Sequence, residues 1–586
     1  MVRREQLQNG RWKCTAVANF TARIVSDIIR DDGAEERRDF GLEAELGGQR
    51  LAFAVPAAEF ARMGWVLQKL GPQAILYPGQ QQHARAAIQC LSDAIREERI
   101  FTHLGWRKHG PEWVYLHAAG ALGAHGPLSG WQVRLPAPLQ HYQLRAPQDP
   151  GGLVRAVRAS LRCLSAAPDR ISLPLLAAVY RAPFGAANFG LFLAGPSGVF
   201  KTALAALSQQ HFGLAMDASN LPANFASTAS ALEWLAFSAK DALLVVDDFA
   251  PTGGAGDGPR QSVAERLFRA AGNHQGRSRL GADGRVGAAQ APRTLVLATG
   301  EEVPQGQSIR ARLLIVEVGP GEVDRATLSE CQRAGQEGLL AAAMGGFVSW
   351  MAGNYEEHQR RLQTRVVELR SQSRGVVSHA RTPSALAELQ SGWERFLQFA
   401  VEVGAIGQAE AEELAQRSWR ALGELALRQT KYQASSDPTL RFVSLLQAAL
   451  AGGKAHVADR RGKMPAEAAV WGWQRKDVGR RWVPRGTRIG WVAGNDLFLE
   501  PRASYQVAQE MAGAERLPVS EQMLRHRLRE RSLLASIDAG RQMLQVRRTL
   551  EGSPRQVLHL RATDVVGLVA EVGGSLLSQP AADGRN

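Results

Sequence analysis

Residues 191 to 202 have the composition of a phosphate-binding loop. An apolar run, LFLA, leads into a glycine turn that ends in Lys201 and Thr202. In such a loop the backbone N–H groups surround the phosphates, the lysine adds a positive charge and the hydroxyl reaches Mg²⁺. Phe200 stands where the GxxxxGK[ST] pattern has glycine, so the loop must reach its shape without that freedom. The pattern predicts that ATP is bound by Gly195, Pro196, Ser197, Gly198, Val199, Phe200, Lys201 and Thr202.

A second run, ALLVVDD at residues 242 to 248, ends in two carboxylates. A short continuous apolar run of this kind is typical of a buried parallel strand, which delivers acids to the carboxyl edge of a sheet. Asp247, with Thr202, is expected to hold Mg²⁺, and Asp248 takes the place of the acid that polarises the attacking water, where Glu is commoner. Taken alone, such a run is more often a buried strand followed by an Asp-rich turn. The phosphate loop upstream favours the catalytic interpretation.

A third apolar run, TLVLATG at residues 294 to 300, places Thr299 at a strand end. AAA+ ATPases keep a polar side chain there, the first sensor, which positions the water near the γ-phosphate. Arg310 and Arg312 then lead into another apolar strand. In a ring ATPase one such arginine reaches the neighbouring subunit's nucleotide and stabilises charge in the transition state. Arg312 is the first choice for this finger, and the alternative for each arginine is a solvated side chain at a strand entrance.

Composition sets the broad class. The chain has 586 residues, which favours three or four domains, and 45% hydrophobic with 22% charged residues are ordinary for a globular protein. A net charge of +14 favours a polyanionic partner such as nucleic acid. The four cysteines are too far apart for a C-x₂-C zinc site and indicate no disulfide framework, so we expect a cytoplasmic protein. No apolar stretch is long enough for a membrane span, and the first residues lack a signal-peptide core.

The order of elements predicts an α/β protein. We expect an N-terminal α/β domain (1–150), a P-loop ATPase core (151–350), a helical lid or extension (351–455), and a small β region with a winged-helix-like domain (456–586). In the first domain the pattern predicts hairpins over residues 12 to 57, helices over 57 to 70 and 83 to 98, and strands around Trp106 and Trp113. Trp106, Arg107 and Lys108 are candidates for nucleic-acid contact, although packing is the commoner role of such a tryptophan.

Three arginines between the acidic strand and the Thr299 strand are candidates for gripping DNA. The stretch GRSRLGADGRVGAAQAPR indicates a hairpin that turns at Asp283-Gly284. In several ring helicases a hairpin at this place projects into the pore, where arginine contacts with phosphate are independent of sequence. A solvent-exposed basic loop is the alternative. The candidate residues are Arg277, Arg279 and Arg285.

The C-terminal part carries two further candidate DNA surfaces. Trp471, Trp473, Trp482 and Trp491 alternate with basic residues, which suits either base stacking or a small sheet with a tryptophan core. Ser520 is a plausible N-cap for a basic helix, and VRRTLEGSPRQVLHL predicts two strands after it. Helix, basic helix and basic hairpin is the order of a winged helix, although many winged helices contact proteins instead. Its candidate DNA-binding residues are Arg525, Arg527, Arg547 and Arg548.

Several of these motifs together resemble a known family. HLGWR (103–107), GPSGVFKT, LLVVDDF and ATGE (298–301) look like the family labelled domain of unknown function 927, over about residues 10 to 350. That family occurs in replication modules of phages, integrated plasmids and pathogenicity islands, and is similar to AAA+ helicases of the superfamily 3 and MCM-like type. The resemblance implies a hexameric, ATP-driven DNA helicase, often found beside a primase. It implies that the phosphates are bound by Gly195, Gly198, Lys201 and Thr202. It also implies that Asp247 and Asp248 contact Mg²⁺ and water, that Thr299 is the sensor, and that Arg312 or Arg310 is the finger.

We therefore expect an ATPase that uses Mg²⁺ and unwinds or translocates along single-stranded or forked DNA as a homo-oligomer, with hydrolysis at subunit interfaces. Two other classes stay open. One is a regulatory or defence AAA+ NTPase that uses ATP as an assembly switch without unwinding. The other is a DNA-binding replication initiator that does not hydrolyse ATP because Phe200 alters the loop.

Overall fold

The computed structural model describes residues 1–147, 149–250, 257–276, 289–372, 381–435, 437–475, 481–513, 516–541 and 543–566. Its contacts divide the chain into two compact units, Met1–Thr430 and Lys431–Asn586. We call these the N-terminal unit and the C-terminal unit. The finer domain boundaries expected at residues 150, 350 and 455 stay predictions.

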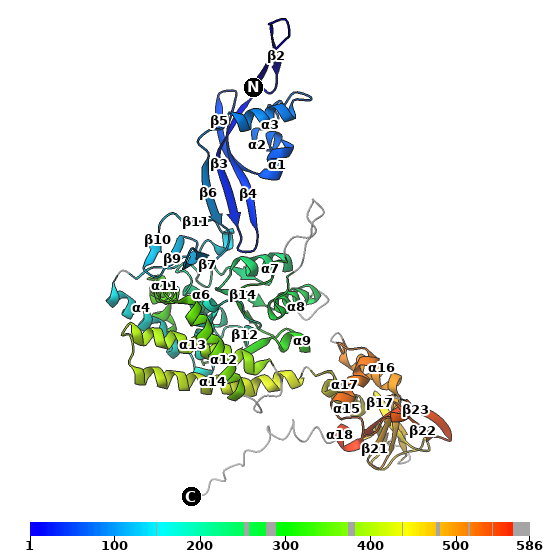
Figure 1. The fold of residues 1–586 in the computed structure, drawn as a ribbon. Helices are drawn as coiled ribbons and strands as arrows, with labels where there is room; N and C mark the ends of the chain where they lie inside the picture. The colour runs from blue at the N-terminus through cyan, green and yellow to red at the C-terminus, as the bar shows by residue number, and fades with distance from the viewer. Residues whose placement is uncertain are drawn as a thin grey trace. The chain divides into compact units, whose positions relative to one another are not determined.

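The first sheet of the N-terminal unit has the strand order β11-β6-β3-β4-β5, and short helices pack on it (Figure 1). Alternate residues of β3 are buried, so its apolar face joins Phe60 and Trp65 in one core. The strands are β3 (Thr21–Asp31), β4 (Glu36–Leu46), β5 (Gln49–Pro56), β6 (Arg96–Phe101) and β11 (Gln132–Val133), and the helices are α1 (Ala57–Arg62), α2 (Trp65–Leu70) and α3 (Gln81–Cys90). A separate hairpin precedes them, formed by β1 (Val2–Gln6) and β2 (Trp12–Ala16).

Two helix predictions in this region are wrong in part. The helix expected over residues 57 to 70 is broken at Met63, whose φ of 58° ends α1. The helix expected over residues 83 to 98 ends at Cys90, and Arg96–Phe101 is a strand instead. That strand runs parallel to β3, with Ser26 opposite Arg96, and its last two residues are buried. Pairing with a distant strand overrides the helix-favouring composition of REERIF.

A second, four-stranded antiparallel sheet of order β10-β9-β8-β7 follows in the chain. It comprises β7 (Gly105–His109), β8 (Glu112–His117), β9 (Gly120–Gly123) and β10 (Gly126–Leu128). The strands predicted around Trp106 and Trp113 are confirmed by β7 and β8. Trp106 is only 2% exposed and its indole donates to the Pro183 carbonyl, so this residue packs in the interior rather than meeting a ligand.

The third sheet is parallel throughout and has the order β13-β14-β15-β12-β16. Its strands are almost entirely buried, which explains their continuous apolar sequences. The strands are β12 (Gly190–Ala194), β13 (Ala223–Asn224), β14 (Leu243–Phe249), β15 (Leu295–Gly300) and β16 (Leu313–Glu317). The helices along this stretch are α4 (Pro150–Arg162), α5 (Asp169–Arg181), α6 (Lys201–Gln210), α7 (Ala229–Ser238), α8 (Asp257–Asn273) and α9 (Gln307–Arg310).

Helices follow the third sheet in the described residues between β16 and β17 (Ala455–Asp459), which agrees with the helical character predicted from residue 351 onward. Those that begin in the N-terminal unit are α10 (Arg325–Gln336), α11 (Leu339–Ala352), α12 (Tyr355–Gln372), α13 (Thr382–Glu402) and α14 (Gln408–Ser435). Trp393 is fully buried, and Phe347 and Phe396 pack edge to face in the same region. Among the helices of the described residues, none is both long enough and apolar enough to cross a bilayer.

The C-terminal unit packs three helices against one face of a five-stranded sheet of order β17-β20-β21-β23-β22. The helices are α15 (Pro438–Ala451), α16 (Pro501–Ala512) and α17 (Glu521–Glu530), with a short α18 (Ala562–Val566). The strands are β17 (Ala455–Asp459), β20 (Thr487–Ala493), β21 (Asp496–Leu499), β22 (Val546–Leu550) and β23 (Ser553–Arg561), beside a small hairpin of β18 (Trp473–Arg475) and β19 (Trp482–Pro484). Ser520 caps α17 as predicted, because its hydroxyl accepts the Met523 N–H at 3.3 Å.

The tryptophans of this unit form its core. Trp471, Trp473 and Trp491 are 5%, 8% and 2% exposed, and Trp482 packs partly buried beside the first two. Of the two interpretations left open by the sequence, the small sheet with a tryptophan core is therefore right. The base-stacking surface is wrong for the three buried residues, because their rings are not accessible to a base.

Candidate nucleotide site

The glycine loop joins β12 to the start of α6. At Gly195 an added Cβ would lie 2.2 Å from the Val318 carbonyl oxygen, so no larger residue fits there. Gly198 has a φ of +82°, which glycine adopts without strain. Phe200 holds a left-handed conformation with a φ of 66° directly before α6. The loop thus has the backbone shape that the missing glycine would provide, at a cost of roughly 1–2 kcal/mol for a residue with a side chain.

Lys201 and Thr202 begin α6 with their side chains turned toward the sheet edge. The Lys201 ammonium donates to the carbonyl oxygens of Gly195 and Pro196 at 2.8 and 2.7 Å. The Thr202 hydroxyl donates to Oδ1 of Asp247 at 3.1 Å. The predicted phosphate loop and the predicted acidic strand therefore meet at one place, although 45 residues separate Thr202 from Asp247.

Asp247 is the centre of this group. Its Oδ1 accepts hydroxyl hydrogen bonds from both Thr202 and Thr299. Thr299 is 1% exposed at the end of β15, which lies between the strand of the glycine loop and the strand of the acids. The same hydroxyl oxygen accepts the Asp248 backbone N–H at 3.2 Å. The sheet order thus places the third predicted residue between the other two, in contact with the acid.

Asp248 lies in β14 at the point where the regular pairing of this strand with β15 is interrupted. The register shifts between Val246 and Phe249, and Asp248 has a φ of 62°, which turns its exposed carboxylate away from the ladder. Asp247 is half-buried beside it. A bulge at this point lets two consecutive residues serve one edge of the sheet, whereas in a regular strand their side chains point to opposite faces.

Acidic groups face the Lys201 ammonium from three positions. Burial lowers the pKa of Lys201 below its ordinary value, and attraction to Glu301, Asp247 and Asp248 opposes that shift. Glu301 follows β15, and its backbone N–H donates to the Phe249 carbonyl at 3.2 Å. The lysine remains the charged, partly desolvated cation that a phosphate requires.

The donor set fits Mg²⁺ and a triphosphate. One hydroxyl and two adjacent carboxylates are hard oxygen ligands, and Mg²⁺ in nucleotide sites takes few protein ligands and keeps its waters. Among the described residues no group of three or more His, Cys, Asp or Glu side chains is placed to hold a metal ion. The residues suited to the metal are Thr202 and Asp247.

Arg310 and Arg312 lie at the opposite edge of the third sheet. Arg312 directly precedes β16, whose Leu313 pairs with Gly190 at the start of β12, whereas the glycine loop follows the end of β12. Its guanidinium donates to Asn273 Oδ1 at 2.7 Å and to the Ser308 hydroxyl at 2.7 Å. Arg310 donates to the Pro304 carbonyl at 3.3 Å. Since β12 spans about 16 Å, neither arginine belongs to the group around Asp247 in its own subunit.

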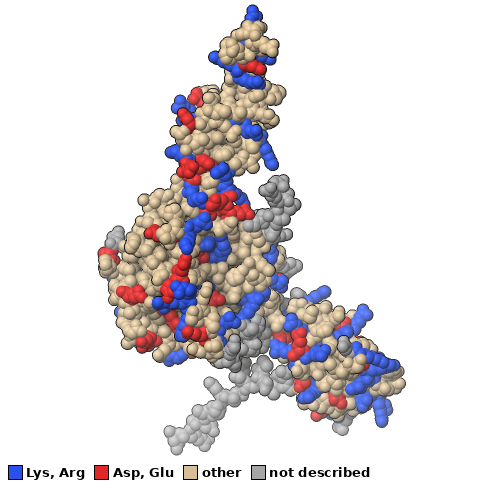
Figure 2. All heavy atoms as spheres, in the orientation of Figure 1, with Lys and Arg blue, Asp and Glu red and all other residues tan. Residues whose placement is uncertain are grey.

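The candidate DNA-binding residues divide into two sets. Arg277, Arg279 and Arg285, with the predicted hairpin, lie outside the described residues. Arg525 and Arg527 are on α17, where they form ion pairs with Glu521 and Glu530 of the same helix. Figure 2 shows lysine and arginine side chains over the β22–β23 part of the C-terminal unit.

Arg547 and Arg548 occupy opposite faces of the β22–β23 hairpin. Arg548 pairs across the strands with Arg555, and its guanidinium lies 6.0 Å from the Phe498 ring. Arg547 pairs with Gln556 of β23. Gln556 lies two residues before Leu558 and therefore on the same face of the strand, and Leu558 belongs to the core beneath α17. The two neighbouring arginines therefore belong to different surfaces, one on the helix side and one on the outer side.

Some residues at the site had no signal in the sequence. The Arg325 guanidinium lies 5.2 Å from the Phe200 ring, so the residue in the glycine position has an aromatic contact of its own. Nothing in the spacing of the two residues indicates that contact. Glu301, the last residue of ATGE, was assigned no role from the sequence, and its attraction to the Lys201 ammonium gives it a part in the local charge balance.

The comparisons with known proteins identify only a fold. No family model and no curated protein matches the chain. A solved structure described as "SCCmec type IV Cch - active helicase" matches with a TM-score of 0.54 and 12% sequence identity, over 96% of this chain and 97% of that chain. The two chains share an overall fold. At this identity the likeness says nothing further about chemistry.

Proposed function

We propose that this chain is an ATP-hydrolysing AAA+ motor that unwinds or translocates along DNA during replication of a mobile genetic element. The observation that carries the proposal is the convergence of Thr202 and Thr299 on the Asp247 carboxylate, with the Lys201 ammonium held by the glycine loop in the field of Glu301, Asp247 and Asp248. The parallel order β13-β14-β15-β12-β16 supports it, because it sets the glycine loop, the sensor position and the acids along one sheet edge. The fold shared with a protein described as an active helicase, and the motifs that resemble the domain of unknown function 927 family, point the same way.

Each residue has a distinct part in the proposed reaction. The backbone of Gly195 to Phe200 and the Lys201 ammonium hold the β- and γ-phosphates of ATP. Mg²⁺, when bound, neutralises charge on the phosphate oxygens. Thr202 and Asp247 supply its protein ligands, and Asp248, whose carboxylate is exposed, orients the attacking water. Thr299 fixes Asp247 through its hydroxyl and the Asp248 backbone through its oxygen.

The arginines at the far edge of the third sheet support a ring. Arg312 has a half-buried guanidinium held by Asn273 and Ser308, an arrangement that orients it on the surface between α8 and α9. Because Arg312 lies far from Asp247 of its own subunit, we assign it to a neighbouring subunit's nucleotide, where it would stabilise charge in the transition state. Arg310 is the second candidate for this role. A homohexamer is the proposed assembly.

Contacts with single-stranded or forked DNA are assigned to two places. The order α15, β21, α16, α17, β22, β23, with β23 between β21 and β22, supports a winged helix in the C-terminal unit. Arg525, Arg527, Arg547 and Arg548 would contact phosphates from its helix and its hairpin. Arg277, Arg279 and Arg285 are proposed to act in the pore of the ring, and a primase is a proposed partner.

A strand-displacement assay on forked DNA tests the proposal. The full chain and Lys201→Ala are compared for ATP hydrolysis and for unwinding, with Lys69→Ala, an exposed lysine, as the matched control. Unwinding that the Lys201 substitution abolishes supports the motor. Hydrolysis without unwinding favours a regulatory switch, and DNA binding that is indifferent to ATP favours an initiator; either result overturns the motor.

A further inference from the structure

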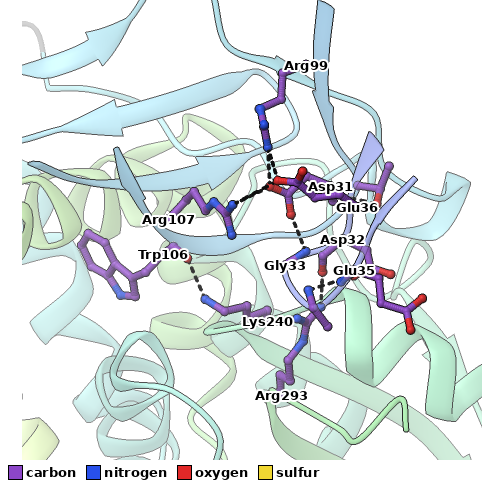
Figure 3. Close-up of polar contacts among 12 residues, drawn as sticks. Asp31, Asp32, Gly33, Glu35, Glu36, Arg99, Trp106, Arg107, Lys240 and Arg293 are labelled. Atoms are coloured by element: carbon purple, nitrogen blue, oxygen red, sulfur yellow. Dashed lines mark hydrogen bonds and ion pairs between the residues drawn. The ribbon is translucent and has the colours of Figure 1, made fainter. Parts of the chain in front are cut away.

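The turn between β3 and β4 contacts the third sheet through buried polar groups (Figure 3). Asp31, at the end of β3, is 1% exposed. Its carboxylate accepts hydrogen bonds from Arg99 at 3.1 Å and from the Gly33 N–H at 2.8 Å, and it pairs with Arg107 at 2.7 Å. A buried carboxylate with this many donors holds the turn in one conformation.

Arg293 connects that turn to β15. Its Nη2 donates to the Asp32 carbonyl and its Nε to the Phe237 carbonyl, both at 2.8 Å, while the guanidinium lies 3.6 Å from the centre of the Phe237 ring. Burial lowers the pKa of Arg293 to about 10, so the side chain stays charged at neutral pH. Arg293, which lies two residues before β15, thus joins the start of that strand to the β3–β4 turn and to helix α7.

The start of β14 is held by the same part of the molecule. The Asp241 N–H donates to the Arg293 carbonyl at 2.9 Å, which ties the entrances of β14 and β15 together. The Asp241 carboxylate accepts the Trp106 N–H at 2.9 Å, and the Tyr115 hydroxyl donates to the Asp241 carbonyl at 2.7 Å. Lys240 donates to the Trp106 carbonyl at 2.8 Å, as Figure 3 also shows.

These two entrances lead to the two groups that meet at the nucleotide site. Asp247 follows Asp241 and Thr299 follows Arg293 at the same separation along neighbouring strands, about 20 Å in extended chain. The strands pair in register from Leu243 opposite Leu295 to Val246 opposite Ala298, the pair that directly precedes Asp247 and Thr299. A shift of one entrance against the other is therefore transmitted along buried strands to the hydrogen bond between Thr299 and Asp247, because packed interiors deform little.

We propose that the β3–β4 turn positions the nucleotide site, with Arg293 as the positioning residue between the N-terminal sheet and the strands of Asp247 and Thr299. The inference rests on the proposed ATPase function and deepens it. The N-terminal sheet then regulates turnover: its turn holds the two entrances aligned, and displacement of the turn slows hydrolysis without weakening the phosphate loop.

Two glycines give a matched test. Gly33 and Gly48 both lie in turns at the ends of β4 and have nearly equal φ values, +83° and +81°. A Cβ on Gly33 would lie 3.0 Å from both Arg293 Nη1 and His103 Nε2, whereas a Cβ on Gly48 would meet nothing within 4 Å. Gly33→Ala and Gly48→Ala therefore carry similar backbone strain, and only the first crowds the side chains of Arg293 and His103, which must shift by a few tenths of an ångström.

The experiment measures kcat and KM for ATP and the thermal midpoint of the full-length variants. For Gly33→Ala we expect kcat to fall by about twofold to fivefold, well below the roughly hundredfold cost of a 1 Å shift at a reacting group, because the Cβ moves its neighbours by only a few tenths of an ångström. KM and the thermal midpoint should match those of Gly48→Ala. Arg293→Lys, which keeps the charge but cannot bridge Asp32 and Phe237 together, should lower kcat in the same way and guards against misfolding of the glycine variant.

Equal kcat values for the two glycine variants, with an unchanged kcat for Arg293→Lys, would overturn the positioning role and leave the ATPase proposal standing. A fall in thermal midpoint that accounts for the loss, with KM raised in parallel, would also overturn it, because the turn would then be merely structural. If the unaltered protein hydrolyses no ATP, the proposed function and this inference fall together.

Discussion

The two units of this chain share one way of using charge and differ in another. In the N-terminal unit, Thr202 and Thr299 both donate to Asp247, and Arg99 and Arg107 both contact Asp31. In the C-terminal unit Arg488 and Arg555 likewise meet at Glu551, but Arg547 and Arg548 lie on opposite faces of the hairpin. Single substitutions should therefore have large effects where donors meet at one carboxylate, whereas the hairpin should respond to the sum of its charges.

We expect the stabilities of the two units to differ most in their response to acid. Burial lowers the pKa of His103 to about 3 and those of His117, His211 and His358 to about 4, and all four are in the N-terminal unit. Below pH 6.5 the unfolded chain takes up protons that the folded unit does not, so stability falls as pH falls from about 6.5 to about 4. At pH 5 each histidine should remove roughly 2 kcal/mol from the free energy of unfolding.

Calorimetry between pH 7.5 and 5 checks this expectation. The transition of the N-terminal unit should move to lower temperature earlier than that of the C-terminal unit. His358→Gln should flatten the pH dependence, whereas His141→Gln, at an exposed position, should leave it unchanged. If both units lose stability in parallel over this range, the contrast between buried and exposed charge fails.

Loss of the Lys201 ammonium should have the largest effect on catalysis. Lys201→Ala removes the cation that faces Asp247, Asp248 and Glu301, and we expect ATP hydrolysis to fall by about 10²–10³-fold or more, as for other groups that stabilise transition-state charge. DNA binding measured by fluorescence anisotropy without nucleotide should be unchanged, because the proposed DNA contacts are made by other residues. A variant that lost both activities equally would contradict the separation.

The two threonines on Asp247 should be distinguishable. Thr202→Val should raise the Mg²⁺ concentration needed for half-maximal hydrolysis, because it removes a proposed metal ligand. Thr299→Val should lower kcat by roughly tenfold with the Mg²⁺ requirement unchanged, because it frees Asp247 and the Asp248 N–H from their shared hydroxyl. Titration of Mg²⁺ for each variant, with the exposed Thr364→Val as control, decides the matter. Identical Mg²⁺ profiles for the two variants would contradict these separate roles.

That Thr202, Asp247 and Thr299 lie together could be expected from the sequence, whereas their role in binding a nucleotide stays a prediction. Asp247 and Thr299 follow buried parallel strands, which bring their last residues to one edge of the sheet, and Thr202 lies in the first turn of the helix that follows β12. The conformation of Phe200 was not predictable, because nothing local favours a left-handed phenylalanine; the loop and the start of α6 impose it. Likewise Arg96–Phe101 is a strand only because β3, far upstream, offers it an edge. Local pattern carries no information about such partners.

The smallest effects on function should come from substitution of the hairpin arginines Arg547 and Arg548. Arg547 is exposed on the side that α17 covers, so Arg547→Ala should weaken binding to forked DNA severalfold and reduce the salt dependence by about one phosphate contact. Arg548, on the outer face beside Phe498, belongs to a second surface and should have a smaller effect on affinity. Its loss should instead lower the thermal midpoint of the C-terminal unit slightly, since its side chain covers an aromatic ring.

Affinities of both single variants and of the double variant, measured at several salt concentrations, test whether one DNA surface or two are present. If DNA contacts only the helix side, the double variant should bind like Arg547→Ala alone. Additive losses would mean that the duplex contacts both faces of the hairpin, as a wing inserted into a groove does. An effect of Arg548→Ala that exceeds that of Arg547→Ala would place the DNA on the outer face and contradict a role for α17, because the sheet separates that face from the helix.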